Sequence, residues 1–213
     1  MPVKNSEMIT EICKILDRIG AVEFGAFKLT SGKVSPYYVD LRIVPSFPDA
    51  FKRICDFYVR FIRNNVGTEC IDRVAGIPVA GIPFASVIAC SLQKPFLYIR
   101  KGVKLQGRQR RIEGIIAPGN RVLLVDDLVA SGLSLQKAAK AIVSEGGVIT
   151  DAVVLLDRQE GGRKKLANSN IELHSMLDIS QIADTLCELG TITDDQCRTI
   201  LKQVKKEQKT RKG

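Results

Sequence analysis

Two adjacent acids followed by a short polar turn are the residues of this chain best suited to chemistry. Asp126 and Asp127 end an apolar run, and the turn Ala130–Ser134 supplies two hydroxyl groups and one glycine. We therefore predict a buried strand that ends at Val125 and a helix that starts near Ser131. Free amides at a helix N-terminus attract phosphate, whereas the two carboxylates would repel it. A ribose 5-phosphate satisfies both groups, because it carries sugar hydroxyls beside its phosphate and can bring a divalent metal.

Three further segments could bind an anion or close a site. Residues 76–83 contain two glycines and two prolines, which suits a close approach by a pyrophosphate. Residues 98–114 hold six basic residues and one acid without apolar periodicity, so we predict a mobile loop that closes over a charged reaction. Arg158 directly follows a predicted strand, where its guanidinium can pair with a carboxylate or a ring carbonyl.

A fourth segment, residues 27–40, carries Tyr37 and Tyr38, which could cap a flat ring. Each segment also has an explanation without a ligand. The acids and their turn could be an ordinary strand–turn–helix, residues 76–83 a rigid turn, and residues 98–114 a solvated basic hairpin. Arg158 could form an ion pair with Asp157, and residues 27–40 could be a hairpin with half-buried tyrosines. Considered one segment at a time, both explanations stay open.

The apolar pattern predicts an α/β fold that would bring these segments together. Strands alternating with helices are typical of a parallel sheet covered on both faces, and ligands bind beyond the carboxyl ends of its strands. The predicted strands are 74–77, 96–99, 122–125, 152–156 and 171–174. The predicted helices are 6–19 with Asn5 or Ser6 as its cap, one that opens on a capping box at 46–49, 82–92, 134–145, 163–167, 179–189 and 194–206.

Composition narrows the class of protein. A chain of 213 residues with 45% hydrophobic residues can form one full domain, and no apolar run is long enough to span a membrane. The six cysteines form no C-x-x-C pair and His174 is the single histidine, which argues against a zinc site and favours a reducing cytoplasm. An intracellular disulfide stays open. The net charge of +9 is concentrated in residues 100–111 and 202–212, and we expect neither nucleic acid nor a membrane as partner.

The run Val122–Ser134 resembles the signature of the type I phosphoribosyltransferases, which bind phosphoribosyl pyrophosphate. Within that family the chain resembles the orotate phosphoribosyltransferases. The branch motifs are F-x-L-x-S-G-x-x-S-P-x-Y from Phe27 to Tyr38, R-K-x-x-K-x-x-G from Arg100 to Gly107, and L-D-R-Q-E-G-G from Leu156 to Gly162.

This resemblance implies a doubly wound five-stranded parallel sheet flanked by helices, with a small N-terminal hood. Residues 1–213 would form one domain, with the hood in about 1–45, the core sheet in about 70–176, and helices with a basic tail in about 178–213. It implies Mg-dependent transfer of the phosphoribosyl group to orotate in pyrimidine (UMP) biosynthesis, giving orotidine 5′-monophosphate and pyrophosphate. It also implies a homodimer that shares the 100–113 loop between subunits, and leaves open an association with orotidine monophosphate decarboxylase.

The resemblance also assigns roles to residues, and Mg²⁺ would be held mainly through substrate and water. The implied catalytic residues are Lys104, Arg100, Asp126 and Asp127. Those implied to bind phosphoribosyl pyrophosphate are Arg100, Lys101, Lys104, Gln106, Asp126, Asp127, Leu128, Val129, Ala130, Ser131, Gly132, Leu133 and Ser134. Those implied to bind orotate are Thr30, Tyr37, Tyr38, Ala130 and Arg158.

Some positions depart from the family pattern. Thr30 replaces a common lysine, Val79-Ala80 replaces Y-K, and Leu105-Gln106 replaces an acid followed by histidine or tyrosine. Gln106 can still donate a hydrogen bond. A sensor that binds phosphoribosyl pyrophosphate without catalysis and a purine phosphoribosyltransferase are the alternatives. The motifs from Phe27 and from Leu156 argue against the purine enzyme.

Overall fold

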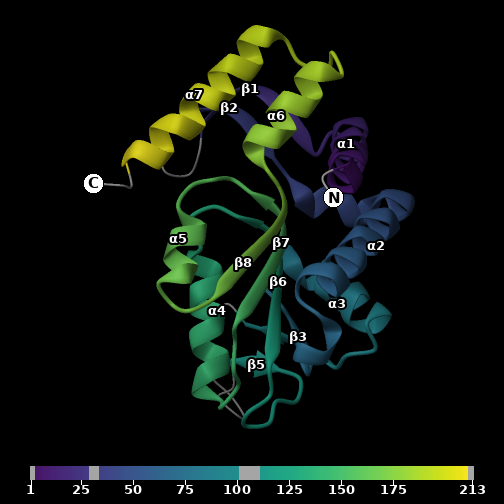
Figure 1. Ribbon diagram of the computed structural model, residues 1–213, viewed down its shortest axis with the longest axis vertical. Coiled ribbons are helices and arrows are strands. Elements are labelled where there is room, and N and C mark those ends of the chain that lie inside the picture. The colour runs from purple at the N-terminus through teal and green to yellow at the C-terminus, as the bar shows by residue number, and fades with distance from the viewer. Residues whose placement is uncertain (1–2, 29–33, 101–110, 211–213) are drawn as a thin grey trace.

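A single six-stranded sheet forms the centre of the molecule (Figure 1), in a computed structural model that describes residues 3–28, 34–100 and 111–210. Its strand order is β5-β4-β3-β6-β7-β8. The strands are β3 (Arg73–Gly76), β4 (Phe96–Ile99), β5 (Ile112–Glu113), β6 (Val122–Val129), β7 (Asp151–Asp157) and β8 (Glu172–Asp178). Five of them pair in parallel, as predicted, and the two-residue β5 adds an antiparallel edge next to β4.

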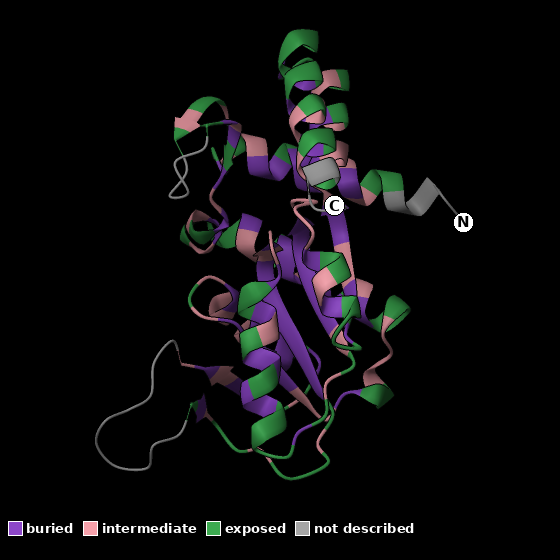
Figure 2. Ribbon diagram, turned by 90° about the vertical axis from the view of Figure 1, so that its left-hand side faces the viewer, coloured by how far each residue is buried: buried purple, intermediate pink, exposed green. Residues whose placement is uncertain are grey.

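Helices cover both faces of this sheet. On one face lie α2 (Pro48–Asn65) and α3 (Gly81–Ser91), and on the other lie α4 (Leu133–Ser144) and α5 (Gly162–Ala167). Successive residues of a strand point to opposite faces. Val153 of β7 accordingly packs in the core beneath α2 and α3, whereas Val154 packs in the core beneath α4. Figure 2 shows the central strands as a buried layer, and the outer strands are only partly buried.

A second, smaller layer lies above the carboxyl ends of the strands (Figure 1). It contains the hairpin β1 (Val22–Lys28) and β2 (Val34–Val39), with α1 (Val3–Arg18), α6 (Ile179–Glu188) and α7 (Asp194–Thr210). α7 packs against β2 and α6, so the C-terminal helices join the N-terminal hairpin rather than the main sheet. Short 3-10 helices occupy Leu41–Ser46 and Thr68–Cys70.

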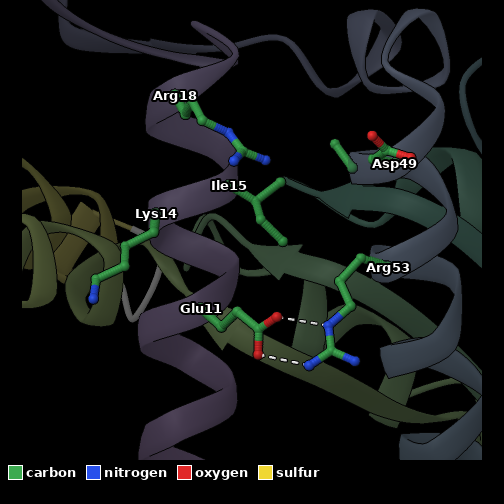
Figure 3. Close-up of a pocket in the computed structure, with 7 residues that line it drawn as sticks. Glu11, Lys14, Ile15, Arg18, Asp49 and Arg53 are labelled. Carbon is green, nitrogen blue, oxygen red and sulfur yellow. Dashed lines mark hydrogen bonds and ion pairs between the residues drawn. The ribbon is translucent and has the colours of Figure 1, made fainter.

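Packing joins the two layers, and a pair of charged side chains on α1 and α2 links them as well. Arg53 of α2 donates two hydrogen bonds to the Glu11 carboxylate of α1, at 2.6 and 2.8 Å (Figure 3). Both side chains are more than two-fifths exposed, so this ion pair contributes little beside the shared apolar core. No described helix is long and apolar enough to cross a membrane.

Two predicted helix caps are wrong, although α2 does begin within residues 46–49, at Pro48. Ser46 belongs to the preceding 3-10 helix, so it cannot open α2, and Phe47 takes the N-cap position without a side-chain hydrogen bond. α1 already begins at Val3, before the predicted cap at Asn5 or Ser6. For α1 the helical backbone continues upstream of the predicted cap, whereas the extended Phe47 separates the 3-10 helix from α2.

Candidate active site

β6 carries the two acids inside the strand rather than beyond its end. The predicted end at Val125 is wrong, because β7 keeps pairing with β6 up to the register Val129 with Asp157. Asp126 and Asp127 are consequently only 7% exposed each. A pair of carboxyl groups in this position is costly to ionise without a partner.

The electrostatics of the pair follow from this burial. Burial and then the neighbouring Asp127 carboxylate raise the pKa of Asp126 well above its usual range. Burial likewise raises the pKa of Asp127. The Asp127 amide donates to Asp126 Oδ1 at 3.0 Å, and the Tyr58 hydroxyl donates to the Asp126 carbonyl at 2.7 Å. Hydroxyls or a cation supplied by a ligand would satisfy the remaining oxygens.

The turn after β6 forms a cradle at the start of α4. Gly132 caps the helix with a φ of +74°, a conformation that favours glycine. The first intrahelical bond runs from the Gln136 amide to the Gly132 carbonyl at 3.0 Å, so the amides before Gln136 are free for a ligand. A small cavity of about 130 Å³ lies here, lined by Asp126 and by residues 128–135.

The turn between β3 and α3 packs directly on the acids. The Ile77 amide donates to the Val125 carbonyl at 3.1 Å. A Cβ atom at Gly81 would lie 2.7 Å from Asp126 Oδ1, so only glycine allows this approach. The segment predicted to approach a pyrophosphate therefore borders the acids and the cradle.

Arg158 extends the same edge at the end of β7. Its amide donates to the Val129 carbonyl at 2.8 Å, and its guanidinium pairs with Glu160 at 2.9 Å and lies 5.3 Å from the centre of the Tyr37 ring. Its Nε atom is buried and has no hydrogen-bond partner among the described residues. The alternative of an Asp157–Arg158 ion pair is wrong, because Asp157 instead pairs with Arg163 at 3.6 Å.

The two tyrosines of the hairpin have different surroundings. Tyr37 is only 2% exposed and packs under the Arg158 guanidinium. Tyr38 is 36% exposed, its hydroxyl accepts a hydrogen bond from Arg42 at 2.9 Å, and its ring lies 5.7 Å from that of Phe27. The hairpin thus meets the sheet edge at Arg158.

The basic segment is described only at its two ends. The Arg100 amide donates to the Arg111 carbonyl at 2.8 Å, and the Arg100 side chain pairs with Glu113 at 2.5 Å. These contacts bring residues 100 and 111 side by side. The remaining predicted site residues of this segment and of the hairpin lie outside the described part of the chain: Thr30, Lys101, Lys104 and Gln106.

Several contributors to this edge were not predicted as site residues. Tyr58 of α2 was not predicted to contact the acids, although a buried hydroxyl needs an acceptor, which was a usable signal. Glu160 and Gly162 lie in the L-D-R-Q-E-G-G motif without a predicted role of their own. A Cβ atom at Gly162 would lie 2.7 Å from the Ala130 carbonyl, so this motif packs on the cradle.

At least four larger hollows lie apart from this cradle in the described part of the chain, and two of them bear on the choice of site. One, of about 520 Å³, is lined by residues of β7, α5, β8 and α7 and borders the buried Asp157 carboxylate. The other, of about 380 Å³, lies between α1 and α2 (Figure 3) and contains none of the predicted site residues. Residue chemistry therefore locates the candidate site better than the size of a hollow.

Comparison with known proteins gives consistent matches. Residues 48–176 match the sequence model of the phosphoribosyl transferase domain. The chain is 41% identical over 199 residues to the orotate phosphoribosyltransferase of Staphylothermus marinus, covering 93% of this chain and 95% of that protein. It resembles the crystal structure of orotate phosphoribosyltransferase from Aeropyrum pernix, with a TM-score of 0.71, 30% identity, and coverage of 84% of this chain and 99% of that one.

A longer protein also matches. The structure of Leishmania donovani UMP synthase is similar with a TM-score of 0.82 and 29% identity, covering 92% of this chain. This chain spans only 42% of that enzyme's length.

Proposed function

Because the chain belongs to the phosphoribosyltransferase family and, within it, to the orotate phosphoribosyltransferases of pyrimidine biosynthesis, we propose that the edge around Asp126 and Arg158 is its active site. The reaction would transfer the 5-phosphoribosyl group from phosphoribosyl pyrophosphate to orotate, giving orotidine 5′-monophosphate and pyrophosphate.

The observation that carries this proposal is the convergence of three predicted segments on one edge. The backbone of Arg158 is bonded to Val129 beside the cradle, Tyr37 of the hairpin packs on its guanidinium, and Gly81 packs on Asp126. An anion-binding turn, two acids and an arginine with an unpaired buried Nε suit a ligand with a phosphate, hydroxyls and a carboxylate.

The ligand would lie across these groups in one orientation. The 5-phosphate accepts hydrogen bonds from amides of the turn Ala130–Ser134, and the ribose hydroxyls donate to Asp126 and Asp127. Arg158 pairs with the carboxylate or a carbonyl of orotate. Leu128 and Val129 shape the strand end beside the sugar, and Thr30 and Tyr38 stay predictions for the orotate side.

The chemical step then follows from charge. The orotate ring nitrogen gives up its proton to the leaving pyrophosphate or to water and bonds to the anomeric carbon, as the bond between that carbon and the pyrophosphate oxygen breaks, with inversion. Negative charge grows on the leaving pyrophosphate, so Lys104, Arg100 and Lys101 stabilise the transition state electrostatically. Gln106 would donate a hydrogen bond to the same leaving group.

The donor set fits a hard divalent cation such as Mg²⁺. Burial raises the pKa of both carboxyl groups, and among the described residues neither forms an ion pair with a lysine or arginine. Carboxylate oxygens are ligands that Mg²⁺ accepts together with substrate and water. When bound, the cation would neutralise charge on the pyrophosphate.

We further infer a homodimer that shares the 100–113 loop between subunits. Association with an orotidine monophosphate decarboxylase is supported by chemistry, since orotidine 5′-monophosphate must lose its carboxyl group to become UMP. The matched UMP synthase has more than half of its length beyond this domain, which leaves room for that second reaction. The expected cytoplasmic location stays a prediction.

The direct test is loss of orotate absorbance after addition of phosphoribosyl pyrophosphate and Mg²⁺, with adenine, hypoxanthine and uracil as alternative bases. We expect turnover with orotate alone. Turnover with a purine would indicate the purine enzyme. Binding of phosphoribosyl pyrophosphate without turnover of any base would indicate a sensor.

A further inference from the structure

We propose that Asp151, Glu172 and His174 form a second, separate metal site for a divalent transition cation with mixed nitrogen and oxygen preference. Each side chain offers one ligand atom, and these three atoms all lie within 4.8 Å of one another. His174 Nε2 already lies 2.7 Å from Asp151 Oδ1.

The register of the sheet creates this cluster. Asp151, the first residue of β7, lies opposite Glu172, the first residue of β8, and His174 follows two residues later. Residues two apart on a strand share a face, so all three side chains project from the same face of two hydrogen-bonded strands. The single histidine and the wide sequence separation concealed this arrangement in the sequence.

The geometry suits coordination after side-chain rotation. Bonds of about 2.0–2.2 Å in a tetrahedral zinc site place the ligand atoms about 3.3–3.6 Å apart. The three atoms now lie within 4.8 Å of one another, so the widest pair would close by about 1 Å or a little more, and the 2.7 Å contact between His174 and Asp151 would open by somewhat less. The strands fix the backbone, and the His174 and Asp151 side chains are just 12% and 22% exposed, so little conformational freedom remains to be lost.

Charge favours a cation here. The carboxyl groups of Asp151 and Glu172 would bring two negative charges to a cation, and within the described residues neither acid forms an ion pair with a lysine or arginine. Imidazole selects Zn²⁺, Ni²⁺ or Co²⁺, whereas Mg²⁺ prefers oxygen ligands and keeps its waters. This site would thus discriminate against the cation proposed for the reaction.

The cluster lies far from the active edge. Asp151 and Asp157 are the two ends of β7, and six residue steps at about 3.3 Å place them about 20 Å apart. A cation at this end would fasten the edge strand β8 to β7 and take no part in phosphoribosyl transfer. The proposal is therefore independent of the proposed function.

Calorimetric titration of the full chain with ZnCl₂, and then with MgCl₂, tests the site. Cys70 and Cys90 are exposed thiols and Cys187 is partly exposed, so all proteins in the series carry serine at these three positions. Glu172→Gln and His174→Gln remove one ligand each, and the exposed Glu23→Gln on β1 is the matched control. The acids Asp126 and Asp127 remain in every protein, so any binding there cancels.

We expect one Zn²⁺ to bind the parent and Glu23→Gln equally, and about 10-fold or more weaker binding to both ligand variants. Zn²⁺ should raise the melting temperature of the parent but not of His174→Gln, and Mg²⁺ should leave it unchanged. Equal Zn²⁺ affinity in all four proteins would overturn the proposal. The proposal would also be overturned if the ligand substitutions lowered the melting temperature while Zn²⁺ left that of the parent unchanged. The cluster would then be a simple ion pair.

Discussion

Arg158 is held from two sides in a way that fixes its direction. Glu160 pairs with one terminal nitrogen and the Tyr37 ring lies against the guanidinium plane, which leaves Nε buried and unpaired. A bidentate contact to a carboxylate contributes about 1.5–3 kcal/mol. Arg158→Ala should therefore raise the KM for orotate about 10-fold or more in steady-state assays and change the KM for phosphoribosyl pyrophosphate little.

Two variants control this experiment. Arg158→Lys should recover only part of the loss, because a point charge cannot reproduce a planar fork. Arg121→Ala removes an exposed arginine that pairs with Asp72 away from the candidate active site. It should leave both KM values unchanged. If Arg158→Ala harms both substrates equally, Arg158 supports the fold through Glu160 instead of binding orotate.

Asp126 and Asp127 oppose stability in the absence of ligand. Burial raises both pKa values, so the folded chain holds protons that the unfolded chain releases above about pH 4. Stability should therefore fall as the pH rises from about 4 through the raised pKa values. The double variant Asp126→Asn, Asp127→Asn has no such carboxyl groups, and it should melt about 2 °C or more above the parent at pH 8.

The same variant should bind phosphoribosyl pyrophosphate about 10-fold or more weakly, because charged acceptors are lost. Melting curves from pH 5 to 8 and calorimetric titration measure the two effects, with the exposed Glu145→Gln as control. The parent should be less stable at pH 8 than at pH 5, and the double variant should not lose stability in this way. An equal loss in the double variant would refute the electrostatic cost assigned to these acids.

Residue types and order predicted which segments meet at this edge of the sheet, but not the contacts between them. The acids, the cradle and Arg158 follow from strand ends and turn chemistry, which are local in sequence. The ion-pair partner of Arg158 could not be predicted from local sequence, because the acids Asp157 and Glu160 are both close to it along the chain. Which acid pairs with Arg158 depends on the direction in which the strand points each side chain. Only the folded strand turns Asp157 toward Arg163 and leaves Glu160 for Arg158.

At the level of elements, periodicity located nearly every helix and strand but not where each one ends. An acidic pair normally signals a strand end, yet β6 runs on to Val129 because β7 offers pairing partners on one side. That information lies some 30 residues away along the chain. β5 was missed for another reason, since two residues are too few to show any period.

The contact between the cradle and α5 gives a prediction at this scale. An added Cβ at Gly162 would lie 2.6 Å from a Val129 methyl and 2.7 Å from the Ala130 carbonyl. The carbonyl belongs to the backbone, so it cannot move away easily. Gly162→Ala should cost about 1–3 kcal/mol in the free energy of unfolding and weaken phosphoribosyl pyrophosphate binding. Denaturant titration and calorimetry measure both quantities.

Gly25→Ala is the matched control, because a Cβ there meets only a Phe27 ring carbon at 3.5 Å, an ordinary contact. It should leave ligand affinity unchanged. Equal stability and equal affinity in the two glycine variants would show that the cradle tolerates displacement and does not depend on this packing.

At the scale of the whole molecule, two segments from opposite ends of the chain form one layer. α7 buries Ile200 and Val204 and packs on β2, which carries Tyr37 toward Arg158. Helical periodicity predicted α6 and α7 but not this placement, because an apolar stripe does not reveal which surface will cover it. The C-terminal helices thus support the hairpin side of the active edge.

The shared loop of the proposed dimer can be tested by mixing two inactive subunits. Lys104→Ala should lower kcat about 10²–10³-fold by removing one electrostatic stabiliser, and Arg158→Ala should cripple orotate binding. If Lys104 serves the neighbouring site, a mixed dimer contains one site with both substitutions and one site with neither. Random mixing in a two-fold dimer then makes about a quarter of all sites intact, and activity should return to about that fraction of the parent.

Sedimentation first has to confirm that the mixed dimer forms, and the activity of the mixture then decides whether the loop is shared. Two differently tagged subunits, co-expressed and purified through both tags, should reach about half of the parent activity per dimer. If Lys104 acts within its own subunit, every site in the mixture carries one substitution, and no activity returns. A chain that sediments as a monomer at assay concentration would refute the shared loop outright, since each site would then be complete within one subunit.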